Sequence, residues 1–143
     1  MDWQSPALTA ALETWLEEDI GRGDLTAAAL KGQQGQAHWV AKQAGRFCGG
    51  PLVQRLFQRL DPGVSVRLLR QDGDAVEAGD CLLELRGAAT ALVAGERTAL
   101  NLAMRLSGIA TATAELVAQL QGTGVRLADT RKTTPGLRLL EKY

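Results

Sequence analysis

The feature of the sequence that most constrains the fold is a long run rich in alanine and leucine, from Thr90 to Gln121. Alanine and leucine have high helix propensities, and Gly95 and Gly108 are the only helix breakers in the run. The run therefore predicts either one long helix or two helices that join at Ser107 and Gly108. An element of this length divides the chain into a part before it and a part after it.

The part before the run alternates between helical and strand-like patterns. A first helix is expected after Ser5, which can cap it, with Pro6 in its first turn and apolar residues at helical spacing. It should end where Gly21 and Gly23 interrupt the pattern. Further along we expect a strand over residues 36–43, a short helix over 51–60, and a long-looped hairpin with strands at 64–70 and 81–86.

The part after the run is short. Residues 125–128 are typical of a buried strand, the polar run 129–136 follows, and residues 136–143 begin a helical pattern. A strand, a loop and a helix make one β/α unit, and a single unit leaves the edges of its strand unpaired. We therefore expect the sequence to be cut off from a longer chain.

These patterns predict an α+β N-terminal domain over residues 1–112, in which a small antiparallel sheet packs with helices. Residues 113–143 are expected to start the first β/α unit of an incomplete β/α barrel. Without the rest of a barrel, two surfaces should lack cover, so that the chain should associate. They are the edge of residues 125–128 and the helix face of Ala99, Leu100, Ala103 and Leu106.

Composition and charge exclude several classes of protein. Lysine plus arginine number 16, and so do aspartate plus glutamate, so neither nucleic acid nor an anionic membrane is expected as a partner. Cys48, Cys81 and His38 are too few for a cysteine–histidine metal centre, and we expect two reduced thiols. The N-terminus lacks a signal-peptide pattern, and no apolar stretch reaches membrane-spanning length. We therefore expect a cytoplasmic protein.

The run from Asp129 to Gly136 carries the most distinctive chemistry. Thr130, Arg131 and Lys132 follow one another at the end of the expected strand, and they offer a hydroxyl, a planar fork of donors and a point cation. Such a set suits planar carboxylates and phosphates. In β/α barrels, catalytic groups lie at the C-terminal ends of the strands. The same residues could also form a solvated basic turn, and their chemistry alone does not separate the two interpretations.

The chain resembles the quinolinate phosphoribosyltransferase family in three runs that stand in the family's order: EDIGRGDLT, GERTALNLAMRLSGIAT and ADTRKTTPGLRLLEKY. A molybdenum-associated, pyrophosphorylase-like group shares the architecture, but Thr134 with Leu137 and Arg138 follows the quinolinate pattern. The resemblance implies that quinolinate and phosphoribosyl pyrophosphate react to give nicotinate mononucleotide, pyrophosphate and carbon dioxide in NAD synthesis, with Mg²⁺. Clustered cations suit such anionic reactants, and a metal would stabilise the leaving pyrophosphate.

The resemblance also assigns residues to the substrate site. It places Thr130, Arg131 and Lys132 in the quinolinate pocket, and it has Arg97 supplied by the neighbouring subunit of a homodimer. By sequence alone, Arg97 could equally be a helix-surface residue paired with Glu96 or a nearby acid. No catalytic residue and no metal ligand can be assigned, because the family's Mg²⁺-holding acids lie in barrel strands that this sequence does not contain. We therefore expect the chain by itself to be inactive.

Two further patterns leave alternatives open. Glu18, Asp19 and Asp24 could form a metal site, but a helix end followed by a turn is the interpretation we favour. Residues 71–80 resemble the hairpin of biotinyl carrier domains, yet no lysine for attachment occurs between Lys42 and Lys132.

The alternative function for the chain is a non-catalytic dimerisation or interaction module derived from the same family. Arg105 is expected to serve packing or an interface.

Overall fold

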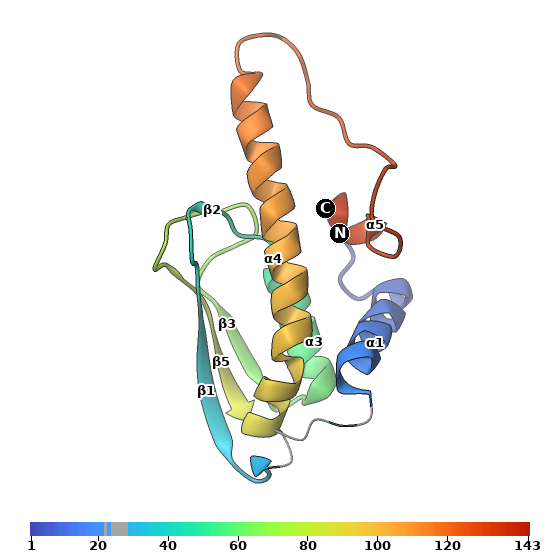
Figure 1. Ribbon diagram of the computed structural model, residues 1–143, viewed down its shortest axis with the longest axis vertical. Helices are drawn as coiled ribbons and strands as arrows, with labels where there is room; N and C mark the ends of the chain where they lie inside the picture. Colours follow the sequence, from blue (N-terminus) through green and yellow to red (C-terminus); the bar gives the residue numbers. More distant parts are fainter. Residues whose placement is uncertain (22, 24–28) are drawn as a thin grey trace.

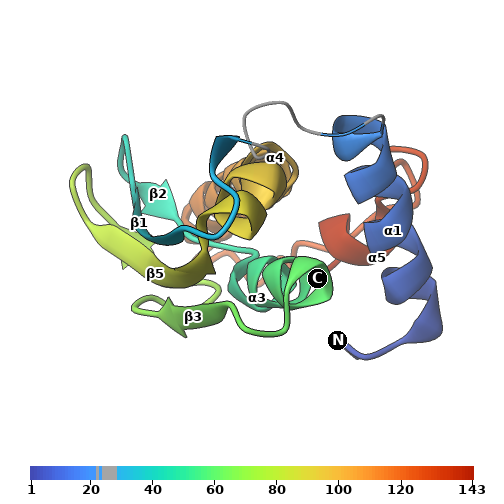
Figure 2. The same ribbon diagram turned by 90° about the horizontal axis from the view of Figure 1, so that it is seen from below.

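The computed structural model describes residues 1–21, 23 and 29–143, so our expectations for Asp24 lie outside the described residues. Figure 1 shows one long helix, α4 (Ala89–Gln119), with a sheet on one side and helix α1 on the other. Viewed from below, α4 and α3 form a middle layer between that sheet and α1 (Figure 2). The α+β arrangement predicted for the N-terminal part is therefore confirmed.

The two helices before α4 form where the sequence predicts them. In α1 (Pro6–Ile20) the Ser5 hydroxyl accepts a hydrogen bond from the Leu8 amide at 3.4 Å, and Leu8, Leu12 and Leu16 are buried. This satisfies an amide that the first turn leaves unpaired and turns one apolar stripe inward. Helix α3 spans Gly50–Leu60 and ends at Asp61.

The sheet contains β1 (Gln34–Val40), β5 (Cys81–Ala88) and β3 (Ser65–Leu68), in the order β1-β5-β3 and antiparallel throughout. The predicted pairing of β3 with β5 is confirmed, with Val66 opposite Leu85. A second, two-stranded sheet of β2 (Gly45–Arg46) and β4 (Ala75–Val76) was not predicted. Leu83 and Leu85 of β5 are fully buried because the central strand faces the helices.

Helix α4 is continuous through Ser107 and Gly108, which decides between one helix and two. The expectation that one face of α4 lacks cover was wrong for Ala99, Ala103 and Leu106, whose exposed fractions are 1%, 4% and 4%. The reason is close packing against the N-terminal elements, since a Cβ at Gly49 would lie only 3.2 Å from the Ala103 Cα. Leu100, which is only partly buried, is the exception.

The strand predicted over residues 125–128 was also wrong. The segment is irregular, and the side chains of Val125 and Leu127 are 60% and 45% exposed. A strand requires a hydrogen-bonded neighbour, and among the described residues no strand lies beside this segment. The following helix, α5 (Arg138–Glu141), is shorter than expected, but it buries Leu140 against the rest of the molecule.

The predicted boundary between residues 112 and 113 falls inside α4, and it stays a prediction. In the part of the chain that the structure describes, no helix combines the length and apolar character needed to cross a membrane.

Candidate functional site

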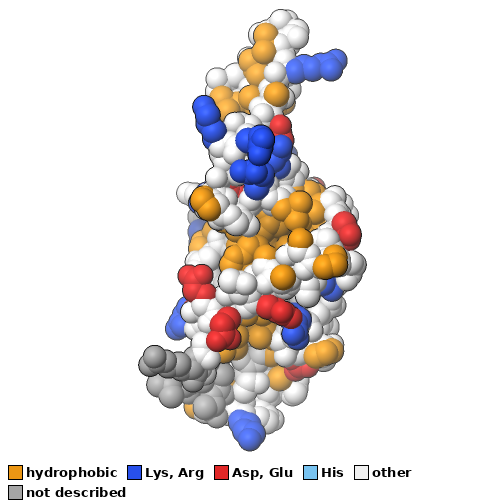
Figure 3. Space-filling view, turned by 90° about the vertical axis from the view of Figure 1, so that its right-hand side faces the viewer, with side chains coloured by type: hydrophobic (Ala, Val, Ile, Leu, Met, Phe, Trp, Pro, Cys, Tyr) orange, Lys and Arg blue, Asp and Glu red, His pale blue; other side chains and the backbone are white. Residues whose placement is uncertain are grey.

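The run from Asp129 to Gly136 lies on the surface between the end of α4 and α5 (Figure 1). The side chains of Thr130, Arg131 and Lys132 are all exposed. Figure 3 shows that Lys and Arg side chains gather on this side of the molecule, above a stretch of hydrophobic side chains. The structure therefore exposes all three predicted residues on the surface between α4 and α5.

The backbone of the run forms a hydrogen-bonded turn. The Lys132 amide donates to the Thr130 hydroxyl at 3.2 Å, and the Thr133 amide donates to the Arg131 carbonyl at 3.0 Å. Arg138 reinforces the turn because its guanidinium donates to the Thr133 hydroxyl at 3.1 Å and to the Arg131 carbonyl at 3.4 Å. Within residues 1–21, 23 and 29–143, neither the Arg131 guanidinium nor the Lys132 ammonium has a hydrogen-bond or ion-pair partner.

An ion pair joins the first residue of the run to the end of the chain. The Lys142 ammonium lies 2.7 Å from a carboxylate oxygen of Asp129. Asp129 therefore has a cationic partner of its own. Its charge is partly neutralised by Lys142 rather than by the neighbouring Arg131 and Lys132, and those two cations remain available to an external anion.

A second cluster anchors the run to α4. The Arg105 guanidinium donates from Nε to Oε1 of Glu141 at 2.7 Å and from Nη2 to the Thr134 hydroxyl. The second carboxylate oxygen of Glu141 accepts the Thr134 amide at 3.0 Å. The Thr134 amide, its hydroxyl and the Arg105 guanidinium together lower the pKa of Glu141 below its ordinary value. Sequence reasoning missed this role of Arg105, because no periodic pattern relates α4 to residues 134 and 141.

Arg97 lies elsewhere on the same helix. It precedes Arg105 by eight positions, which corresponds to about 12 Å along the helix axis. Its side chain is 75% exposed, and its guanidinium lies 3.9 Å from a carboxylate oxygen of Asp19 in α1. In the single chain, Arg97 thus pairs with α1 rather than with a residue of the Asp129–Gly136 run. The nearby acid expected as its alternative partner is Asp19 rather than Glu96.

Two family models match the chain. The quinolinate phosphoribosyl transferase N-terminal domain matches residues 24–107, and the C-terminal domain of the same enzyme matches residues 109–143. The chain belongs to the quinolinate phosphoribosyltransferase family. The Asp129–Gly136 run falls within the part that matches the C-terminal domain of this family. Arg97 and Arg105 fall within the part that matches the N-terminal domain.

Individual relatives agree with this assignment. The chain is 50% identical over 92% of its length to a probable nicotinate-nucleotide pyrophosphorylase (carboxylating) of Synechocystis sp., and 47% identical over 95% to that of Bacillus subtilis. The crystal structure of NadC from Streptococcus pyogenes superposes with a TM-score of 0.90 at 38% identity over 95% of the chain. The chain spans 45%, 47% and 49% of these relatives, respectively. The predicted fold class, a family N-terminal domain followed by part of a barrel, is confirmed.

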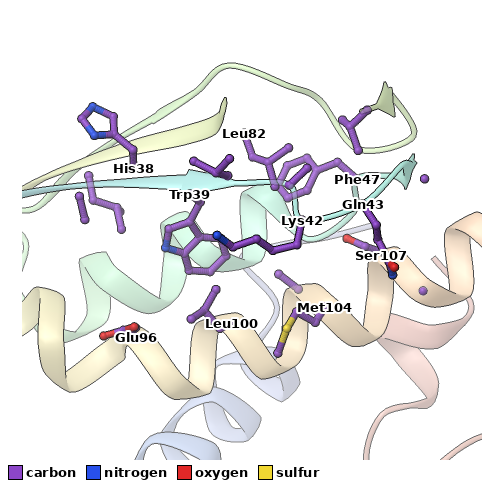
Figure 4. A pocket seen from close by; sticks show the side chains of 18 of the residues that line it. His38, Trp39, Lys42, Gln43, Phe47, Leu82, Glu96, Leu100, Met104 and Ser107 are labelled. Carbon is purple, nitrogen blue, oxygen red and sulfur yellow. The ribbon is translucent and has the colours of Figure 1, made fainter. Parts of the chain in front are cut away.

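The structure also contains a groove that the sequence did not predict. It encloses about 1040 Å³ between β1 and α4, and it is mainly apolar. Trp39, Leu82, Leu100 and Met104 lie along it, and the Lys42 side chain extends across it (Figure 4). Residues of the Asp129–Gly136 run do not line the groove.

The Mg²⁺ that the family resemblance implies stays a prediction. Among the described residues, no three His, Cys, Asp or Glu side chains converge on a point where a metal ion could be held. Cys48 and Cys81 are not bonded to each other, and burial, with a smaller effect of Asp72, raises the pKa of the Cys48 thiol to about 11. A neutral, buried thiol is a poor metal ligand and a poor nucleophile.

Proposed function

We propose that this chain forms the carboxylate-binding part of a quinolinate phosphoribosyltransferase. The reaction would convert quinolinate and phosphoribosyl pyrophosphate to nicotinate mononucleotide, pyrophosphate and carbon dioxide in NAD biosynthesis. The main support for the proposal comes from the hydrogen-bonded turn of residues 130–133. On this turn Arg131 and Lys132 are exposed, and neither has a partner among the described residues. The names of the relatives, nicotinate-nucleotide pyrophosphorylases, agree with this chemistry.

The hydrogen-bond donors of Thr130, Arg131 and Lys132 suit the two carboxylates of a planar dicarboxylate. Arg131 can donate two parallel hydrogen bonds to one carboxylate, while Lys132 adds a cation that can approach the other. The Thr130 hydroxyl already accepts the Lys132 amide, so its own hydrogen is free to be donated to a ligand oxygen. The turn thus offers donors and positive charge, which is what an anionic substrate requires.

We further propose that the enzyme acts as a homodimer in which Arg97 reaches the active site of the neighbouring subunit. Its contact with Asp19 is long at 3.9 Å and its side chain is largely exposed, so little free energy is needed to release it. Such an arrangement would explain why Arg97 pairs with α1 rather than with the Asp129–Gly136 run within one chain.

The reaction would take place in the cytoplasm, in keeping with two unpaired cysteines.

The proposed reaction uses Mg²⁺ with the pyrophosphate donor, and the described residues contain no cluster of three or more His, Cys, Asp or Glu side chains that could hold a metal ion. The contribution of this chain is binding and orientation of the dicarboxylate, and we expect the chain assayed alone to form no nicotinate mononucleotide.

A calorimetric titration of quinolinate into the chain tests the proposal. Arg131→Ala should weaken binding by about tenfold or more, since a charge-assisted hydrogen bond is lost. Arg67→Ala is the matched control, because Arg67 is 74% exposed on β3, away from the run, and should bind like the wild type. Equal affinities for all three proteins, or no binding by the wild type, would contradict the proposal.

A further inference from the structure

We propose that Arg105 is a positioning residue for the turn formed by residues 130–133, which we call the substrate turn. Arg105 holds this turn through Glu141 and Thr134 without contacting the substrate. The identity of the ligand rests on the function proposed above. The anchoring itself rests on contacts within this chain.

The contacts form a closed cluster of three side chains and one backbone amide. Arg105 bonds both Glu141 and Thr134, and Glu141 in turn accepts the Thr134 amide with its other oxygen. The Glu141 side chain is only 9% exposed, so the carboxylate is shielded from water and both of its oxygens are occupied. Charge-assisted hydrogen bonds of this kind are stronger than neutral ones, and the Arg105 side chain, which is 46% exposed, leaves the cluster open to solvent on one side.

Among the described residues, the cluster is the polar side-chain link between residues 129–142 and the rest of the protein, and Tyr143, which follows that segment, lies beside Asp72 and packs edge-on against Trp3. Among the described residues, every other side-chain hydrogen bond or ion pair of residues 129–142 joins two members of that same segment. Arg105, in contrast, belongs to α4, whose flanking residues Ala103 and Leu106 are buried in the core. The rigid helix therefore fixes Thr134, which lies two positions after Lys132, and through it the direction of the turn.

Two of the three nitrogens of the Arg105 guanidinium are committed to the anchoring contacts. Its Nε and Nη2 groups bond Glu141 and Thr134, whereas Arg131 and Lys132 remain unoccupied within the described residues. A lysine in its place would have one compact ammonium group on a flexible stem, which cannot reproduce the planar fork. Arg105→Lys should therefore restore only part of the anchoring that Arg105→Ala removes.

The test measures hydrogen exchange of the Thr134 amide by NMR, together with quinolinate affinity, in the full chain. Arg105→Ala should accelerate Thr134 exchange about tenfold or more and weaken quinolinate binding by a similar factor, with Arg105→Lys intermediate. Glu141→Gln should reproduce the effect of Arg105→Ala on exchange. Exchange within α3 should remain unchanged, which shows that the variants are folded.

Arg59→Ala is the matched control, because Arg59 forms a comparable pair with Glu13 at 2.8 Å that joins α3 to α1. It should change neither Thr134 exchange nor quinolinate affinity. Unchanged Thr134 exchange in Arg105→Ala overturns the proposal, and so does faster exchange with wild-type quinolinate affinity. If the wild type binds no quinolinate, the proposed function fails, and the exchange rates alone decide whether Arg105 anchors the turn.

Discussion

Ser107 and Cys48, which lie 59 positions apart, form a reciprocal pair of hydrogen bonds. The Ser107 hydroxyl accepts the Cys48 amide at 3.0 Å and donates to the Cys48 carbonyl at 3.2 Å. The pair satisfies both backbone groups of the residue that leads into α3. This contact ties the middle of α4 to the connection between the sheet and α3.

Ser107→Ala should lower the free energy of unfolding by about 1–3 kcal/mol, since it leaves the backbone groups of buried Cys48 without a partner. Urea denaturation measures the change. Ser65→Ala is the control, because Ser65 is exposed and its hydroxyl makes only a long contact of 3.5 Å. Equal stability of the two variants would show that the pair contributes nothing.

The two glycines of α4 should respond in opposite directions to alanine. A Cβ at Gly95 would lie 2.7 Å from a Leu60 methyl and 2.8 Å from the Phe57 ring, so Gly95→Ala should cost about 1–3 kcal/mol through overpacking. A Cβ at exposed Gly108 would meet nothing within 4 Å, so Gly108→Ala should stabilise the helix by about 0.5–1 kcal/mol. Thermal unfolding of both variants tests the packing of α4 on α3, and a shift of the same sign in both would refute it.

Asp72 should stabilise the start of α3. One of its carboxylate oxygens accepts the amides of Gly49 and Gly50 at 2.9 and 2.8 Å, at the positive end of that helix. Asp72→Ala should therefore lower the free energy of unfolding by about 1–2 kcal/mol in urea denaturation. Glu115→Ala, at an exposed position of α4, should leave it within about 0.5 kcal/mol of the wild type. Equal losses in both variants would argue against the cap.

The sequence predicted the elements whose patterns are local. The spacing of Leu8, Leu12 and Leu16 and the cap at Ser5 were enough for α1, and the alanine-rich run was enough for α4. The buried face of α4 was not predicted, because the position of Gly49 against Ala103 depends on tertiary packing rather than on periodicity. The strand at 125–128 failed for a similar reason, since hydrophobic content does not specify a pairing neighbour.

The candidate site was predicted only in part. Thr130, Arg131 and Lys132 stay predictions, and they could be proposed because consecutive polar residues are visible in a sequence. The role of Arg105 was missed, because its partners lie 29 and 36 positions further along the chain. The groove beside Trp39 was missed as well, since it arises from the spacing between β1 and α4.

The anchoring of the substrate turn should depend on pH. The pKa of Glu141 in the folded chain lies below its ordinary value of 4.5, so the contribution of its charged form is complete above that value. The contribution should be lost as the pH falls through the lowered pKa. The Thr134 amide resonance should therefore shift with a midpoint below pH 4.5, and the shift should be absent in Glu141→Gln. A midpoint at or above 4.5 would contradict the cluster.

The most direct test of the account is a map of backbone amide shifts during a quinolinate titration of the full chain. The largest changes should fall on residues 130–133, and Arg131→Ala should remove them. Changes confined to the groove around Trp39 and Met104, or the absence of any change at saturating quinolinate, would contradict it.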